Sequence, residues 1–447
     1  MQELKKVLEL PARFIDITLQ TSKITSILVK DGVAKDISSG EVFGIGVRVL
    51  GKRWGFASSN SRDNIYEMAE QAYKIARRGD EEIEFTTMGG AKDEVAIKPK
   101  IDPEDVSIEE KREIVGRAER EVKDYAEVVS SSFSYFDSKI KIDYVNSEGA
   151  DIQLKDTKVA LFSSAFAKKD DKVQFGSERI GGTGGLELIA DCENSARKAA
   201  EKAIRLLSAK EAPSGNFDVV LDPKLTGVFI HEALGHATEA DHVIQGESIL
   251  EGKLGKEIAS NLVTVYDEPT LQGSFGFYFY DSEGVEGGKT TLIEDGVLRS
   301  YLHSRETSSK LNQENTGNAR SQSYSHQPIV RMSNTYLKPG EYDFEEILEG
   351  IKYGVYLKGS KGGEVDTARG IFQFSAEEGF LIENGEVTTP VKDVALSGET
   401  LEILKKVSAT GKDFELSIGF CGKAGQAVPV GDGGPHIRTF ATVGGAE

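Results

Sequence analysis

The feature that most constrains this chain is the run HEALGH at residues 231–236, in which two histidines stand five positions apart. Each residue of a regular helix advances by roughly 100°, so this spacing sets the two imidazoles roughly 140° apart around the axis. Rings at that angle do not reach one metal ion from an undistorted helix. A π-bulge, with hydrogen bonds from i to i+5, or an early helix end at Gly235 brings them to one side. The run therefore predicts a distorted helix.

The side chains of the run suit metal chemistry. Two neutral imidazoles bind divalent transition metals, and a carboxylate beside them can act on water at the metal. We therefore predict that His231 and His236 are metal ligands and that Glu232 is a general base. Catalytic zinc has three protein ligands and one open position, so a third ligand is required. The residues alone leave five candidates for it: Glu239, Asp241, His242, Cys421 and His436.

The chain contains two cysteines, which is too few for a disulfide framework and fits a reducing compartment. Cys421 lies between glycines in the segment GFCGK (419–423), which permits close approach of the backbone. Lys423 nearby favours the thiolate, a strong zinc ligand. An inert buried thiol is the alternative for Cys421. Cys192 is predicted to be inert.

Size and charge restrict the classes of partner. A chain of 447 residues is too long for one ordinary core, so two or three domains are expected. A net charge of −19 opposes binding to nucleic acid or to an anionic membrane. The chain has no run of eighteen apolar residues, so no transmembrane helix is predicted. The first residues, MQELKKVLELPARF, lack the apolar core of a signal peptide. We expect a cytoplasmic protein with no nucleic-acid or membrane partner.

The first half of the chain alternates strand and helix patterns. Strands are predicted over 14–29, 44–50 and 55–59, helices over 62–78, 107–125 and 196–207, and four or five further strands between 127 and 179. Strands followed by an alanine-rich helix occur twice, which suggests an internal structural duplication.

The small polar segment 208–216 predicts a domain boundary, with domains over 1–212 and 213–447. The second half begins with a strand at 217–221 and a helix from Pro223 to about Val243 that carries the histidines. Turns and strands dominate the rest, and the near copies LIEDG (292–296) and LIENG (381–385) predict two hairpins. The expected fold class is α+β: an N-terminal α/β domain followed by a β-rich, barrel-like domain carrying the HExxxH helix.

Two glycine-rich segments have only a superficial likeness to nucleotide-binding loops. GVEGGKT (284–290) has Glu283 where a phosphate-binding loop has glycine, and a strand pattern follows it. We interpret it as a hairpin connection. GGTGG (181–185) is interpreted as a structural loop.

Residues 316–336 are rich in polar and aromatic side chains and are a candidate substrate wall. Tyr324 or His326 could donate a hydrogen bond to an oxyanion, and Arg331 could hold a carboxylate. Ordinary structural hydrogen bonds are the alternative for each of these three residues.

Five ordered motifs resemble the TldD/PmbA family of zinc metallopeptidases, strongly over 215–447 and more weakly over the first half. These motifs are HEALGHATEAD (231–241), DSEG (281–284), TGNARSQSYSHQPIVRMSNTY (316–336), GGEVDTARGIFQFS (362–375) and GFCGKAGQAVPVGDGGP (419–435). The TldD branch of that family carries HExxxH, whereas the TldE or PmbA branch lacks it. The chain therefore resembles TldD.

The resemblance implies properties that the residues leave open. His231, His236 and Cys421 match the family's zinc ligands, Glu232 matches its catalytic glutamate, and one Zn²⁺ per chain is implied. The family fold joins an N-terminal α/β domain to a barrel-like C-terminal domain. In this family TldD pairs with a TldE/PmbA-like paralogue, and for this chain a homodimer is the alternative. Family substrates are unfolded peptides and precursors of peptide natural products.

The sequence thus predicts a zinc-dependent peptidase in which Glu232 accepts a proton from water at the metal. The alternative is a non-hydrolytic scaffold subunit with a structural zinc site, which requires four protein ligands. A redox enzyme containing another metal, such as iron, is a third possibility.

Overall fold

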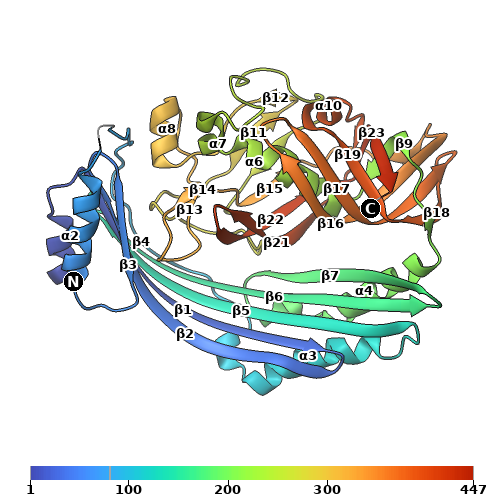
Figure 1. The fold of residues 1–447 in the computed structure, drawn as a ribbon, viewed down its shortest axis with the longest axis horizontal. Helices are drawn as coiled ribbons and strands as arrows, with labels where there is room; N and C mark the ends of the chain where they lie inside the picture. The colour runs from blue at the N-terminus through green and yellow to red at the C-terminus, as the bar shows by residue number, and fades with distance from the viewer. Residues whose placement is uncertain (1, 80–81, 446–447) are drawn as a thin grey trace.

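The N-terminal half forms a long curved sheet that underlies the second half of the chain (Figure 1). The computed structural model describes residues 2–79 and 82–445. The strand order is β3-β2-β1-β5-β6, with β4 and β7 both paired to β6, and the β4–β6 pairing is the parallel one. The strands are β1 (Phe14–Lys30), β2 (Val33–Leu50), β3 (Trp54–Ser59), β4 (Lys92–Ala96), β5 (Val128–Asn146), β6 (Asp151–Lys169) and β7 (Lys172–Thr183).

Three long strands occupy the region where four or five shorter ones were predicted. β5 and β6 have 19 residues each, and the turns between the three strands lie near Gly149 and Asp170. Polar residues inside these long strands are paired within the sheet, as Ser138 is with Ile24 of β1. From the sequence alone, polar residues inside a long strand look the same as polar residues at the end of a strand, because the neighbouring strand that pairs with them is not known.

The N-terminal half is built from two copies of one arrangement. Two runs of elements, α1-β1-β2-β3-α2 and α3-β5-β6-β7-α4, follow one another, and β1 pairs antiparallel with β5 at the centre of the sheet. This order agrees with the predicted duplication. The helices are α1 (Gln2–Leu8), α2 (Ile65–Ala76), α3 (Ile108–Val122) and α4 (Cys192–Leu207), with short 3₁₀ turns η1 (Pro103–Asp105) and η2 (Leu186–Ile189).

The sheet has both faces covered. Along β6, Val159 and Leu161 belong to the core formed with α3 and α4, whereas Ala160 packs against Phe275 and Ile418 of the second half. Successive side chains of a strand point to opposite faces, so one strand contributes to both cores. The curved sheet is therefore a layer between its own helices and the domain that carries the histidines.

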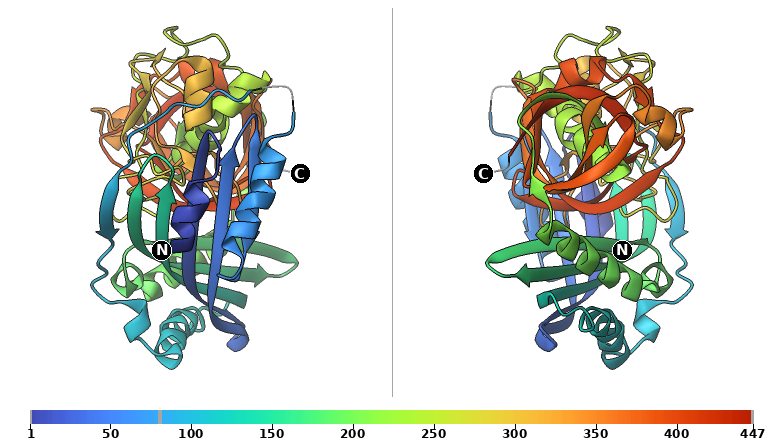
Figure 2. Two further views of the ribbon diagram at one scale, coloured as in Figure 1. Left: turned by 90° about the vertical axis from the view of Figure 1, so that its left-hand side faces the viewer. Right: turned by 90° about the vertical axis from the view of Figure 1, so that its right-hand side faces the viewer.

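The second half contains a closed five-stranded barrel, in which the pairing of β16 with β17 completes the ring β16-β9-β23-β19-β17. Figure 2 (right) looks into this barrel, whose orange and red strands surround a yellow-green helical segment. β18 (Glu386–Lys392), β8 (Lys210–Glu211) and β20 (Ala409–Thr410) extend its edges. The ring strands are β9 (Gly215–Leu221), β16 (Tyr353–Asp366), β17 (Ile371–Glu383), β19 (Val394–Glu399) and β23 (Ile437–Gly445).

A second sheet, of order β12-β11-β10-β15-β22-β21, lies beside the barrel. Its strands are β10 (Val265–Asp267), β11 (Thr290–Glu294), β12 (Val297–Leu298), β15 (Asn334–Leu337), β21 (Glu415–Lys423) and β22 (Gln426–Gly434). Outside the two sheets lie the pair β13 (Ala319–Arg320) and β14 (Ile329–Val330), the helices α8 (Arg305–Leu311), α9 (Phe344–Leu348) and α10 (Thr400–Lys405), and the helical segment that carries the histidines.

The helix predicted from Pro223 to about Val243 is a series of four short pieces. Asp222 caps the first of them by accepting a hydrogen bond from the Leu225 N–H. Phe229 anchors the series to the barrel, with its ring 5.2 Å from that of Phe372. The pieces are α5 (Pro223–Phe229), a π-helical turn η3 (Ile230–Gly235), α6 (His236–Thr238) and α7 (Ala240–Gln245).

Several sequence-based expectations about the fold are confirmed. The mixed α+β class with a barrel in the second half is observed. The two predicted hairpins are β11–β12 and β17–β18, with Asp295-Gly296 and Asn384-Gly385 at positive φ in their turns. A strand, β11, follows the segment 284–290. No helix of the described residues is long and apolar enough to cross a membrane.

A buried ionic network joins the two halves of the chain. The Arg48 guanidinium on β2 lies 2.5 Å from Asp16 on β1 and 2.9 Å from Glu283 of the second half, and all three side chains are nearly inaccessible to solvent. Glu283 also accepts the backbone N–H of Arg305. Because both carboxylates share one guanidinium, its removal leaves two buried charges without a cation.

We expect Arg48→Met to destabilise the protein by about 3–5 kcal/mol, the range for breaking a buried ion pair by removing one partner. Scanning calorimetry would measure the fall in Tm. Arg120→Met is the matched control, since the Arg120–Glu113 pair is exposed. Equal Tm values for the two variants would contradict a role for the network in joining the halves.

Candidate metal centre

A π-helical hydrogen bond brings the two histidines of the motif together. The N–H of His236 donates to the C=O of His231, five residues earlier, within η3. The two rings lie with centroids 5.3 Å apart and planes at 88°. The distortion that the five-residue spacing requires is therefore present, in the form of a π turn.

Gly235 allows this turn for a different reason from the one expected. Its backbone angles, φ −56° and ψ −51°, are those of an ordinary helix, so no special conformation is required. A Cβ at this position would lie 2.0 Å from the sulfur of Met332, which belongs to the main core. Any other residue here would have to displace the Met332 side chain, because the π turn packs directly onto it.

Cys421 joins the two histidines from a strand near the end of the chain. Its sulfur lies 3.4 Å from Nε2 of His236, and the ligand atoms of His231, His236 and Cys421 all lie within 4.8 Å of one another. All three residues are buried. β21 carries Cys421 to this place through its pairing with β22, which in turn pairs with β15 beneath the π turn.

The cluster has the charge and donor set of a transition-metal site. Burial acts to raise the pKa of the Cys421 thiol, but hydrogen bonds and charge from His231 and His236 outweigh it and lower that pKa to about 5. Nδ1 of His231 is buried without a hydrogen-bond partner among the described residues. Two imidazoles and a thiolate converging in a buried place fit zinc.

Glu239 holds the ring of His236 in one orientation. Its Oε2 lies 2.9 Å from Nδ1 of His236, so Nδ1–H donates to the carboxylate and Nε2 faces Cys421. The side chain of Glu239 is fully buried. Burial raises its pKa, but His236 and Lys423 outweigh burial and lower it to about 2. A carboxylate on the far nitrogen is the usual orienting partner of a metal-binding histidine.

Lys423 connects the strand of Cys421 to the helical segment of His236. Its ammonium lies 3.0 Å from Glu239 and 2.7 Å from Asp241, and it donates to the Val330 carbonyl at 3.1 Å. Glu239 and Asp241 were candidate metal ligands in the sequence, but here they surround this ammonium. Because Lys423 follows Cys421 by two positions on one strand, both side chains point to the same face.

Glu232 stands at the open side of the cluster. Its Oε2 is 3.8 Å from Nε2 of His236, and its side chain is 39% exposed, whereas that of His236 is 11% exposed. An ionisable group that contacts both solvent and the cluster is placed to exchange protons with water or a ligand there.

The remaining candidate ligands lie in other environments. His436 pairs with Asp413 at 2.6 Å and with the Tyr356 hydroxyl at 2.8 Å, outside the cluster. His242 lies beside Glu239 and Asp241, the two carboxylates that pair with Lys423. Cys192 is buried in the core with α3, and burial raises the pKa of its thiol to about 12, as expected for an inert cysteine.

The three residues predicted to form a substrate wall are dispersed. Arg331 is fully buried, and its guanidinium donates to the carbonyls of Cys421 and Gln426, so it supports the β21–β22 hairpin. Tyr324 lines a separate groove that faces the curved sheet. His326 lies on a loop beside Ser323, 3.1 Å from its hydroxyl. The Arg331 contacts were not foreseeable, because they depend on a hairpin some ninety residues away.

Comparison with known families matches almost the whole chain. Three family models match in order: PmbA/TldA metallopeptidase domain 1 over 15–76, the central domain over 101–207 and the C-terminal domain over 214–445. The chain belongs to the PmbA/TldD metallopeptidase family.

Individual relatives agree with this membership. A metalloprotease of Methanothermobacter thermautotrophicus is 51% identical over 97% of this chain and 95% of its own length. A zinc metalloprotease TldD homolog of Saccharolobus solfataricus is 32% identical, covering 97% of each chain. The crystal structure of TldE from Thermococcus kodakarensis has the same fold, with a TM-score of 0.82, 20% identity and complete coverage of both chains.

We expect Glu239→Gln to weaken Zn²⁺ binding by roughly 10- to 100-fold, the usual effect of removing an orienting partner of a metal ligand. Competition with a chromogenic chelator would measure the affinity. Glu247→Gln, an exposed change just beyond α7, is the control. Unchanged affinity in the Glu239 variant would show that His236 does not need this hydrogen bond.

Zinc binding should release protons and weaken as the pH falls. The charges of Glu239 and Cys421 raise the pKa of His236 against the opposing effect of burial, so without metal this ring holds a proton at neutral pH. Zinc must displace that proton, and affinity then falls by about tenfold per pH unit for each proton released. Calorimetric titration in buffers of different ionisation enthalpy would count these protons, and a count of zero would contradict the charge state.

Proposed function

We propose that this protein is a zinc-dependent peptidase that hydrolyses unfolded peptides or processes peptide precursors. The observation that carries the proposal is the buried cluster of His231, His236 and Cys421, with Glu232 on its exposed side. Membership of a metallopeptidase family supports it.

The residues divide the work between holding a metal and moving a proton. His231, His236 and Cys421 would hold one Zn²⁺ per chain, which supplies Lewis acidity toward a peptide carbonyl and lowers the pKa of water. The Glu232 carboxylate accepts the proton of the attacking water and delivers it to the nitrogen of the leaving amine. The thiolate ligand contributes negative charge, which makes the centre a weaker Lewis acid than one with three histidines.

Peptide substrates are expected to bind in extended form. Main-chain hydrogen bonds to a strand tolerate varied side chains, and they require a chain that is locally unfolded. We further propose a TldE/PmbA-like paralogue as the partner, with a homodimer as the alternative, a cytoplasmic location, and a functional boundary between residues 212 and 213. The TldE-like fold of this chain supports the choice of a paralogue.

A non-hydrolytic scaffold with a structural zinc site is the second candidate. Such a site needs four protein ligands, and the cluster formed by the described residues contains three. Glu232 is close to the cluster but partly exposed, which favours the peptidase.

We expect Glu232→Gln to retain zinc and to lose peptide cleavage by about 10²–10⁴-fold in kcat, the contribution of a general base. Metal analysis together with digestion of a peptide library would measure both properties. The isosteric amide keeps the size of the side chain and removes its basicity. Cleavage at the parental rate would contradict the assignment of Glu232, and iron in place of zinc would favour a redox enzyme.

A further inference from the structure

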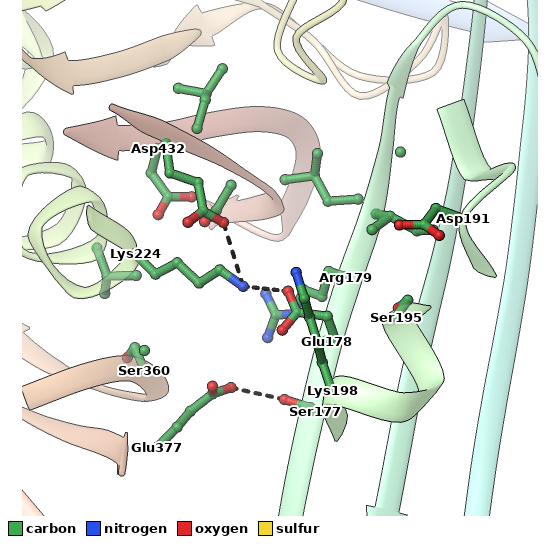
Figure 3. A pocket seen from close by; sticks show the side chains of 18 of the residues that line it. Ser177, Glu178, Arg179, Asp191, Ser195, Lys198, Lys224, Ser360, Glu377 and Asp432 are labelled. Atoms are coloured by element: carbon green, nitrogen blue, oxygen red, sulfur yellow. Dashed lines mark hydrogen bonds and ion pairs between the residues drawn. The ribbon is translucent and has the colours of Figure 1, made fainter. Parts of the chain in front are cut away.

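A cavity of about 350 Å³ lies between the curved sheet and the domain that carries the metal cluster (Figure 3). One wall is formed by β7 and α4, which carry Arg179 and Lys198. The other is formed by α5, β21 and β22, which carry Lys224, Ser417 and Asp432. The cavity is therefore lined by both halves of the chain.

The cavity adjoins the metal cluster along two elements. Lys224 and Val228 line it from α5, and Glu232 follows four residues later on the same continuous helical segment. On β21, Ser417 lies in the cavity wall and points to the same face as Cys421. Gly419 separates these two residues, and a Cβ added there would meet only Asp432 and Val430, at 3.8 and 3.9 Å. The absent side chain leaves space between the cavity and the cluster.

Asp432 is an unsatisfied acid in this wall. It is 8% exposed, and its Oδ2 is buried without a hydrogen-bond partner among the described residues. Its neighbour across the β21–β22 ladder is Ser417, whose buried Oγ likewise has no partner in the part of the chain that the structure describes. Two adjacent polar residues, one of them an acid, thus lie in the wall of the same cavity with unpaired polar atoms. Buried polar groups rarely lack a hydrogen-bond partner in the protein unless a ligand or a water molecule supplies one.

The other acids of the cavity have partners within the protein. Lys224 pairs with Glu178 and lies 3.5 Å from Glu415. Glu377 pairs with Lys202. Figure 3 shows Asp432 on the β22 side of the cavity and Glu178 with Arg179 on the β7 side. Arg179 lies near enough for its charge to act on Asp432, but no ion pair joins the two side chains in residues 2–79 and 82–445. Asp432 is therefore the acid of this wall that can accept a cation from outside.

We propose that the cavity is a substrate subsite, in which Asp432 and Ser417 bind a cationic group of the peptide. The group is an ammonium or guanidinium, from a lysine or arginine side chain or from a free amino terminus, because a carboxylate and a hydroxyl can both accept its hydrogen bonds. This inference rests on the proposed peptidase function and assigns Asp432 as its determinant of specificity.

Matched peptides test the subsite. A cleaved library peptide is compared with versions that carry lysine, norleucine or glutamate at each position, and with an N-acetylated version. A charged hydrogen bond of this kind should make the cationic peptide preferred by about tenfold or more in kcat/KM. Loss of preference on lysine-to-norleucine exchange identifies a side chain as the source, and loss on acetylation identifies the amino terminus.

Asp432→Asn should reduce that preference to within about twofold of unity, since the amide loses the charge and keeps the shape. Glu415→Gln is the matched control, because it removes an acid from the same cavity that already faces Lys224; the preference should persist. A preference that survives in the Asp432 variant, or a preference for the glutamate peptide, would overturn the proposal.

Binding separates failure of the subsite from failure of the proposed peptidase. Zinc-loaded Glu232→Gln is titrated with the same peptides, labelled for fluorescence anisotropy. Tighter binding of the cationic peptide, lost on adding Asp432→Asn, supports the subsite even if the parent protein cleaves nothing. Equal binding of the lysine, norleucine and acetylated peptides would overturn it, whatever the result for cleavage.

Discussion

The hydrogen bond from the His236 N–H to the His231 carbonyl is the constraint on which the site depends. It adds one residue to a helical turn and moves two side chains, otherwise far apart around the axis, to one side. The turn is stable where it is because the surrounding core accommodates it. Gly235 rests on Met332, and Phe229 is fixed against the barrel wall. A π turn is poorly stable by itself, so packing on both sides must supply the stabilisation.

The second half of the site is a β-hairpin held at the correct distance from that turn. The buried guanidinium of Arg331 binds carbonyls of the hairpin, at Cys421 and at Gln426. Lys423 binds Glu239, which in turn orients His236. The thiolate and the imidazoles are thus positioned by one connected set of charged hydrogen bonds. Such networks fix the relative positions of the groups that they join, although Glu239 Oε1 and Arg331 Nε have no hydrogen-bond partner among the described residues.

The curved sheet of the N-terminal half lies next to the domain that carries the cluster and lines one side of the cavity between them. This sheet is covered by its own helices on one face and by the second half of the chain on the other, and the Arg48–Glu283 ion pair crosses between the two halves. The cavity beside the cluster exists because the two layers do not close completely there. In this arrangement the duplicated sheet forms one wall of the cavity beside the cluster.

Local patterns in the sequence determined the histidine pair, its need for a distorted helix, the two hairpin turns and the mixed fold class. Spacing and turn chemistry act over a few residues and are readable without a partner. Resemblance to a family, and not spacing, singled out Cys421. Only the tertiary structure decided that Glu239 and Lys423 orient His236, that Arg331 supports a hairpin and that Asp432 lies in a cavity wall with an unpaired carboxylate oxygen. Each of these roles depends on which strand lies beside which helix, and that is set by packing of segments far apart in the chain.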